Sequence, residues 1–356
     1  MPHAAATPED LRYCRAVLPR VSRTFALNIR LLAGGLAEAV RTGYLLCRSA
    51  DALEDSWPGA PHEIEARFDA LLAGLGGDAQ AARDLAAAAG ARLAAGGAAG
   101  VPGGARARDA VAAELALVAH LPAVLRVHAA LAAADREAVA ECVRTMARGM
   151  RRYAARAAGR ARGAPYLDDE GELHDYCWVV AGCVGTMLTR LAGQRLGGLA
   201  ARDEARLHEL APVVGEALQL TNILLDWPSD VRRGRCHVPA AWLDEAGLAP
   251  TDLVGADRPG VRALAARLER LARAALGRVP DYLALVPRRA VRYRLFVAWP
   301  ALWALRSLEH ARRDPEFPWG EARPRLPRAE LWRVALGALI APEPADPLRR
   351  AAWSAR

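Results

Sequence analysis

The sequence contains no lysine: all 48 of its basic side chains are arginine. A lysine Schiff base and the lysine-containing loop of P-loop nucleotide-binding proteins are therefore excluded. No G-x-G-x-x-G motif follows a strand-like segment, so a dinucleotide-binding Rossmann fold has no support. No stretch of about 20 residues is free of charge, and we therefore expect no membrane-spanning helix.

The cysteine and histidine patterns argue against structural disulfides and against a zinc site. The six cysteines include no C-x-x-C pair, and a chain of this length needs no disulfides to stabilise its core. We therefore expect reduced thiols and a cytoplasmic protein. The eight histidines show no H-E-x-x-H spacing, which argues against zinc. The first residues are polar and typical of a helix start, so we expect no signal peptide.

The composition is that of a globular protein with an excess of positive charge. Of the 356 residues, 53% are hydrophobic and 25% are charged, and the formal net charge is +8. This charge favours an anionic partner, which could be a nucleic acid, an acidic lipid or a phosphorylated small molecule. Because the chain lacks a helix-turn-helix, zinc or RNA-binding signature, we expect no nucleic-acid partner.

Hydrophobic residues recur at helical spacing along almost the whole chain. Breaks rich in glycine and proline separate the helical segments, and no run of alternating β-branched residues remains to form a sheet. We predict an all-α fold with a single domain over residues 1–356, a mobile Ala/Gly-rich segment at 79–104 and C-terminal helices within 313–356. The acidic run from Asp168 to Glu170 is expected to cap a helix.

A first acidic cluster consists of Asp51, Glu54 and Asp55. Spacings of three and four residues put the three carboxylates on one face of a predicted helix. Hard divalent ions such as Mg²⁺ bind oxygen ligands of this kind together with substrate phosphates. An acidic helix end at the surface is the alternative, so this cluster alone does not define a site.

A second polar stripe lies far downstream, where Asn222, Asp226 and Asp230 follow one another at four-residue spacing. Two oxygen-bearing stripes on separate helices can face each other across a bundle and hold several Mg²⁺ ions. The basic segment that follows has forked donors suited to phosphate oxygens, although taken alone it could be a solvated loop. The candidate substrate-binding residues of this region are Gln219, Asn222, Arg232 and Arg235.

Four ordered segments of the chain resemble the motifs of the squalene/phytoene synthase family, the head-to-head isoprenyl diphosphate synthases. The resemblance extends over about residues 10–312 and is greatest to bacterial squalene synthases. It implies an isoprenoid-synthase helical bundle with a central apolar cavity. The four segments are Ser22 to Phe25, Tyr44 to Asp55, Tyr176 to Gly185 and Gln219 to Pro239.

The resemblance also implies a reaction and a set of site residues. Two molecules of farnesyl diphosphate condense through presqualene diphosphate to squalene, with Mg²⁺ assisting diphosphate release and NADPH supplying a hydride. The implied catalytic residues are Tyr176, Tyr44, Asp51, Asp55, Asp226 and Asp230. The implied Mg²⁺ ligands are Asp51, Glu54, Asp55, Asn222, Asp226 and Asp230. The implied binders of the first diphosphate are Ser22, Arg23 and Thr24, and Phe25 of the same motif is an implied substrate-binding residue. Arg48 lies one turn before Asp51, where its guanidinium could bridge phosphate and carboxylate.

Some positions leave alternatives open. Leu225 and Ser229 stand where the family commonly has arginine and glutamate, and Pro228 is expected to kink or end the helix. Gly182 and Gly185 could either leave room for a prenyl tail or let two helices approach closely. Each tyrosine could instead be a packing residue with a locally bonded hydroxyl.

The product and the partners also remain open at this point. Phytoene, dehydrosqualene and presqualene diphosphate synthases are alternatives with the same fold, and a catalytically weak binding partner in a terpenoid assembly is an alternative of another class. The phosphates of NADPH are expected to bind Arg323, Arg325 and Arg328, which resemble a basic flap of squalene synthases and could otherwise form a basic surface loop. A hydrocarbon product must leave to lipid, so we expect peripheral contact at the inner membrane face. The sequence does not predict the oligomeric state.

Overall fold

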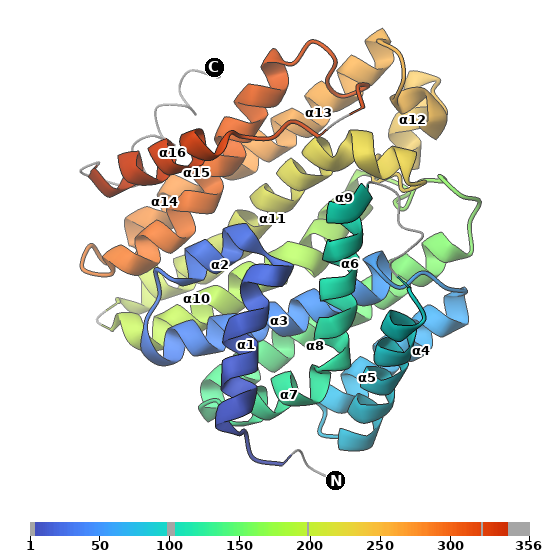
Figure 1. Ribbon diagram of the computed structural model, residues 1–356. Coiled ribbons are helices and arrows are strands. Elements are labelled where there is room, and N and C mark those ends of the chain that lie inside the picture. Colours follow the sequence, from blue (N-terminus) through green and yellow to red (C-terminus); the bar gives the residue numbers. More distant parts are fainter. Residues whose placement is uncertain (1–3, 98–103, 198, 322, 341–356) are drawn as a thin grey trace. The chain divides into compact units, whose positions relative to one another are not determined.

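A computed structural model describes residues 4–97, 104–197, 199–321 and 323–340 (Figure 1). Helices joined by loops make up this part of the chain, and its β-type pairing is limited to an isolated bridge between Pro165 and Cys236. The predicted all-α class is therefore confirmed. The helices gather into two compact units, Met1–Gly159 and Arg160–Arg356. The treatment of residues 1–356 as a single domain stays a prediction.

The first unit contains eight α-helices within its described residues. These are α1 (Pro8–Val21), α2 (Arg23–Ile29), α3 (Gly34–Asp55), α4 (Pro61–Leu75), α5 (Ala79–Ala94), α6 (Gly104–Ala119), α7 (Leu121–Ala129) and α8 (Ala133–Ala158). Most residues of α3 are buried, and the majority of these are small or aliphatic. The helix packs against α8, α7, α6 and α4. Helix α3, which carries the first acidic cluster, is therefore the core helix of this unit. Of the predicted mobile segment 79–104, residues 79–94 form α5, and 98–103 lie outside the described residues.

The second unit is organised around one long helix, α11, which contacts helices on several sides (Figure 1). Its elements are α9 (Glu170–Cys177), the π-helical turn η1 (Trp178–Gly182), α10 (Cys183–Leu196), α11 (Ala201–Arg232), α12 (Ala240–Ala246), the 3-10 turn η2 (Pro250–Leu253), α13 (Pro259–Leu276), α14 (Val279–Leu285), α15 (Val291–Arg313) and α16 (Arg328–Ile340). Asp169 caps α9 by accepting a hydrogen bond from the Glu172 amide at 2.9 Å, which confirms the predicted capping role of the acidic run. Residues 341–356 of the predicted C-terminal region lie outside the described residues.

Glycines determine how closely η1 and α10 pack against α11. A Cβ atom at Gly185 would overlap the carbonyl oxygen of Ala211, and a Cβ atom at Gly215 would overlap that of Ala181. At Gly182 the nearest neighbours would be the Trp178 ring and Pro212. Of the two explanations open from the sequence for Gly182 and Gly185, the structure therefore supports close helix approach.

The helix α11 continues through Pro228 to Arg232. Of the two predicted effects of this proline, a kink or an end of the helix, the second is wrong, and the first stays a prediction. Only one turn follows the proline, and within that turn the Ser229 Oγ donates a hydrogen bond to the Asp226 carbonyl at 2.9 Å. The second polar stripe therefore remains on a single helix.

In the described part of the chain, no single helix has both the length and the apolar composition needed to cross a membrane. The bent pair of α6 and α7 satisfies those two criteria only when its helices are taken together.

Candidate active site

Four side chains of the first unit form a stripe along α3. Tyr44, Arg48, Asp51 and Asp55 are separated by four, three and four residues, so they share one face of the helix. The Arg48 Nη1 donates a hydrogen bond to the Asp51 Oδ2 at 3.1 Å. The third carboxylate of the predicted cluster, Glu54, is buried, whereas Asp55 is exposed. All three carboxylates lie on the regular helix α3, and the role of Glu54 as a metal ligand stays a prediction.

Arg48 of this stripe has a second carboxylate partner, which the sequence analysis missed. Glu114 of α6 is buried and accepts a hydrogen bond from the Arg48 Nη2 on one carboxylate oxygen and from the Ser56 Oγ on the other. Burial raises the pKa of Asp51 to about 6; the charge of Arg48 opposes this shift, and Asp55 adds to it. The sequence signal for Glu114 was an isolated acid within the apolar run from Val111 to Val118.

The residues predicted to bind the first diphosphate lie at the start of α2. Ser22 is its N-cap, and the Ser22 hydroxyl accepts a hydrogen bond from the Phe25 amide at 3.2 Å. The Phe25 ring stacks on Tyr44 with centroids 5.1 Å apart. Burial raises the pKa of Tyr44 to about 12, although Arg48 and a hydrogen bond with Ser22 act in the opposite direction. Thr24 is exposed, and the side chain of Arg23 lies outside what the structure describes.

The second polar stripe runs along the last turns of α11. Asn222 is exposed and both Asp226 and Asp230 are half-buried, so the stripe is accessible to solvent. The intervening Leu220, Ile223 and Leu224 are buried, as the helical spacing predicts. Leu225, at the position where the family commonly has arginine, is also buried, with 2% of its surface exposed.

Arg323 forms an ion pair with Asp226. Its Nη1 lies 2.7 and 2.9 Å from the two carboxylate oxygens of Asp226. The segment before Arg323 is held by Arg232, whose guanidinium donates hydrogen bonds to the carbonyl oxygens of Gly320 and Trp319. Arg325 and Arg328, predicted with Arg323 to bind a cofactor, are exposed. The structure thus brings Arg323 to the predicted metal ligands.

Tyr176 lies in an aromatic cluster near the end of the second stripe. It is buried, and its ring centroid is 5.3 Å from that of His237, which is also 4.9 Å from that of Tyr166. The His237 Nδ1 lies 3.6 Å from the Asp230 Oδ2. The π-helical turn η1 begins two residues after Tyr176, and such turns are frequent at functional sites. His237 lies within the segment from Gln219 to Pro239 that resembles the family, but the sequence analysis did not single it out.

The remaining predicted residues of this unit are Gln219 and Arg235. Both are half-buried, and the Arg235 amide donates a hydrogen bond to the Asp230 carbonyl at 2.8 Å. Across the residues that the structure describes, no three His, Cys, Asp or Glu side chains converge closely enough to hold a metal ion by themselves. The α3 stripe belongs to the first unit and the α11 stripe to the second.

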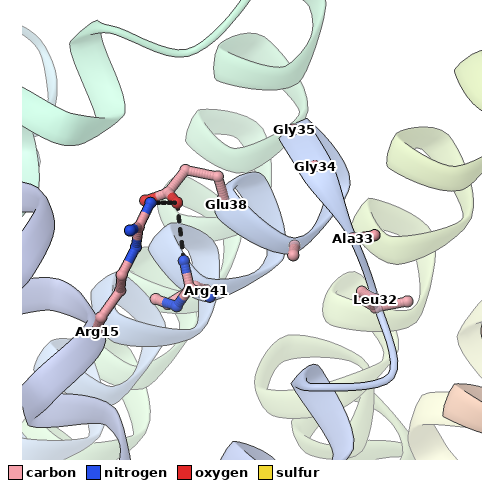
Figure 2. A pocket seen from close by; sticks show the side chains of 8 residues that line it. Arg15, Leu32, Ala33, Gly34, Gly35, Glu38 and Arg41 are labelled. Atoms are coloured by element: carbon pink, nitrogen blue, oxygen red, sulfur yellow. Dashed lines mark hydrogen bonds and ion pairs between the residues drawn. The ribbon is translucent and has the colours of Figure 1, made fainter.

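A hollow of about 380 Å³ lies at the other end of α3, near its first turn (Figure 2). Its polar lining comes from Glu38, which pairs with Arg41 at 2.8 Å and with Arg15 at 3.4 Å. Asp51 lies 13 residues after Glu38 on the same helix, a separation of about 20 Å. The hollow is therefore distinct from the α3 stripe.

Comparison with known protein sequences identifies the family. The sequence profile described as squalene/phytoene synthase matches residues 18–330. The phytoene synthase of Thermus thermophilus is 41% identical over 140 residues, a match that covers 37% of this chain and 45% of that protein. The phytoene synthase of Pseudescherichia vulneris is 44% identical over 100 residues, covering 28% of this chain and 29% of that protein. The matched segment is thus less than half of either relative.

Solved structures show the same fold at lower identity. TcSQS in complex with the ligand E5700 has a TM-score of 0.66 at 21% identity, covering 98% of this chain and all of that one. A dehydrosqualene synthase in complex with a ligand has a TM-score of 0.60 at 22% identity, covering 93% and 96%. Since the relatives by sequence are phytoene synthases, the squalene-specific part of our prediction stays a prediction. The chain belongs to the squalene/phytoene synthase family, whose members are transferases acting on prenyl diphosphates.

Proposed function

We propose that this protein catalyses the head-to-head condensation of two prenyl diphosphates through a cyclopropyl diphosphate, with farnesyl diphosphate as substrate and squalene as product. One observation carries the proposal: each polar stripe contains an aspartate paired with an arginine, Asp51 with Arg48 and Asp226 with Arg323. Carboxylates bind divalent cations and arginines bind diphosphate, so each stripe has the donors needed for a metal-bound diphosphate.

The donors present fit Mg²⁺. This ion binds through one or two carboxylates and completes its octahedron with water and substrate phosphates, so it needs no cluster of three protein acids. The residues that would hold it are Asp51 and Asp55 on α3, and Asn222, Asp226 and Asp230 on α11. When bound, Mg²⁺ would neutralise the charge that develops on the departing diphosphate.

The other residues of the site bind and orient the substrate. Arg48 presents a guanidinium beside Asp51, and the Ser22 hydroxyl lies at the N-terminus of α2, where both suit a diphosphate oxygen. We assign the proton loss that closes the cyclopropane to the neighbourhood of Tyr176, whose ring packs against His237. The apolar side chains around these positions would exclude water from the carbocation.

The reductive step and the chain length are tested together in one experiment. The purified chain is incubated with farnesyl or geranylgeranyl diphosphate, with Mg²⁺, and with or without NADPH, and the products are identified by mass spectrometry. Squalene formed only with NADPH supports the proposal. Phytoene from the twenty-carbon substrate would instead favour the activity named for the sequence relatives. In the reductive reaction, the exposed Arg325 and Arg328 would bind cofactor phosphates.

The same assay tests the catalytically weak alternative, which was motivated by Leu225 and Ser229. Leu225 is buried among the packing residues of α11, so its apolar character has a structural reason independent of activity. We therefore expect Mg²⁺-dependent diphosphate release. The absence of release with any prenyl diphosphate would contradict the proposed activity and favour the binding-partner alternative.

We also propose that the outward face of α16 contacts the membrane. Trp332, Leu336 and Leu339 recur at helical spacing on that face and are 58%, 60% and 52% exposed. Arg328 and Arg333 are exposed on the same helix. An apolar stripe with arginines beside it suits the boundary between acyl chains and anionic headgroups.

Flotation with vesicles of anionic or zwitterionic phospholipid tests this contact. We expect the full chain to float with anionic vesicles and the Trp332→Ser, Leu336→Ser double variant to remain unbound. Val291→Ser is the matched control, since Val291 is also exposed but lies at the start of α15. Equal flotation of the double variant and the wild type would contradict the proposal.

A further inference from the structure

Glu114 connects two helices of the first unit at the α3 stripe. One carboxylate oxygen accepts a hydrogen bond from the Arg48 guanidinium, and the other accepts one from the Ser56 hydroxyl. Arg48 lies three residues before Asp51, and Ser56 directly follows Asp55. One buried acid on α6 therefore holds both ends of the segment that carries the predicted metal ligands.

The three charges form a chain in which Arg48 lies between two carboxylates. The Nη1 of Arg48 donates to Asp51 and the Nη2 donates to Glu114. Because the two terminal nitrogens of the guanidinium donate to different acids, Arg48 does not form a bidentate ion pair with Asp51. The side chain of Glu114 is only 8% exposed, so water competes little for its bonds.

We infer that Glu114 is a positioning residue that keeps Arg48 from neutralising Asp51. This inference rests on the proposed function of the α3 stripe. With Glu114 in place, the charge of Arg48 is shared, and Asp51 retains enough negative charge to bind a divalent cation. Without that shared charge, Arg48 is attracted to Asp51 alone, and Mg²⁺ has to compete with it.

The test variant is Glu114→Gln, which keeps the size and one acceptor but removes the charge. Its matched control is Glu38→Gln, because Glu38 bridges Arg15 and Arg41 at the other end of the same helix (Figure 2). The readout is the rise in melting temperature of the full chain when Mg²⁺ is titrated in the presence of inorganic pyrophosphate. Activity at each Mg²⁺ concentration is measured in parallel.

We expect Glu114→Gln to raise the half-saturating Mg²⁺ concentration about tenfold in both measurements, and Glu38→Gln to leave it unchanged. The shift should vanish in an Arg48→Gln background, because the effect acts through Arg48. A lower melting temperature with an unchanged Mg²⁺ midpoint would assign Glu114 a structural role only and overturn the inference. The same shift in the Arg48→Gln background would also overturn it.

Failure of the proposed function gives a different result. In that case the wild-type chain releases no diphosphate from any prenyl substrate at any Mg²⁺ concentration. If the wild type is active and Glu114→Gln has an unchanged midpoint, only the role of Glu114 is wrong. Glu114→Asp serves as the second variant should the glutamine variant fail to fold, and its shorter carboxylate should give an intermediate midpoint.

Discussion

The first unit contains two aspartate–arginine pairs in which the pKa of the aspartate is shifted in opposite directions. Asp10 accepts hydrogen bonds from Arg126 on both carboxylate oxygens, at 2.9 and 2.6 Å, and this pairing lowers the pKa of Asp10 to about 2. Asp51 shares Arg48 with Glu114, and burial raises the pKa of Asp51 to about 6. An arginine devoted to one acid stabilises the fold, whereas an arginine shared between acids leaves negative charge for a ligand.

The largest expected effect is on turnover, which should depend on Asp51 but not on Asp10. Asp51→Asn and Asp226→Asn should each lower turnover by about a hundredfold or more, because each removes a charge that would hold the metal-bound diphosphate. Asp10→Asn should leave turnover unchanged. Steady-state diphosphate release, with circular dichroism to verify helix content, makes the comparison. Similar turnover of the wild type and Asp51→Asn would mean that the α3 stripe is not the site.

A second prediction tests whether an arginine can be accommodated at position 225, beside the α11 stripe. Leu225→Arg restores the residue common in the family, but position 225 is buried, so the substitution places an uncompensated charge in the core. We expect a loss of about 3 kcal/mol in the free energy of unfolding. Leu225→Met, which conserves volume, should lose less than about 1.5 kcal/mol. Denaturant melts measure both variants, and an unchanged stability of Leu225→Arg would show that the side chain reaches solvent.

The two pairs should also respond to pH with opposite signs. A folded-state pKa lowered to about 2 means that Asp10 contributes about 2 kcal/mol to stability above its unfolded pKa near 4. That contribution is lost as the pH falls from about 4 to 2. A folded-state pKa raised to about 6 means that ionised Asp51 opposes folding, so its effect appears as the pH rises from about 4 to 6.

Melting curves of the wild type, Asp10→Asn and Asp51→Asn between pH 2 and 7 check these signs. The Asp10→Asn protein should be less stable than the wild type at neutral pH and equal to it near pH 2. The Asp51→Asn protein should be more stable than the wild type at neutral pH, with the difference vanishing near pH 4. Parallel curves for all three proteins would contradict both assignments.

The smallest expected effect concerns the arginines of the C-terminal segment. Arg323→Gln removes the partner of Asp226 and should reduce both half-reactions, whereas Arg325→Gln should reduce only the NADPH-dependent one, by about tenfold. The ratio of squalene to presqualene diphosphate, measured by mass spectrometry, distinguishes them. If both variants change the ratio equally, the contact of Arg323 with Asp226 is irrelevant to the first step.

Local sequence signals predicted much of this structure. Helical periodicity gave the all-α class and the two stripes, and the Asp169 cap followed from an acid placed just before a helix. Close helix approach at Gly185 remained undecided because one chain does not reveal what lies opposite a glycine. Pro228 was overestimated as a helix terminator, since its missing amide matters little one turn before the helix ends.

The contacts that the sequence did not predict are long-range. Glu114 meets Arg48 across 66 residues, and Arg323 meets Asp226 across 97 residues. Neither spacing belongs to a motif, because tertiary packing alone brings these side chains together. His237 was missed for the same reason: its neighbour Tyr166 lies in another segment of the chain.

The glycine contact between η1 and α11 has a mechanical consequence. The backbone of Gly215 packs directly against the backbone of Ala181, so a side chain at Gly215 would push α11 away at this point and tilt it. Asp226 lies 11 residues further along, which makes a lever arm of about 16 Å. A side chain introduced at Gly215 that tilted the helix by about 5° would displace the carboxylate by about 1.4 Å. The position of a carboxylate at one end of the helix is thus set by the absence of a side chain three turns away.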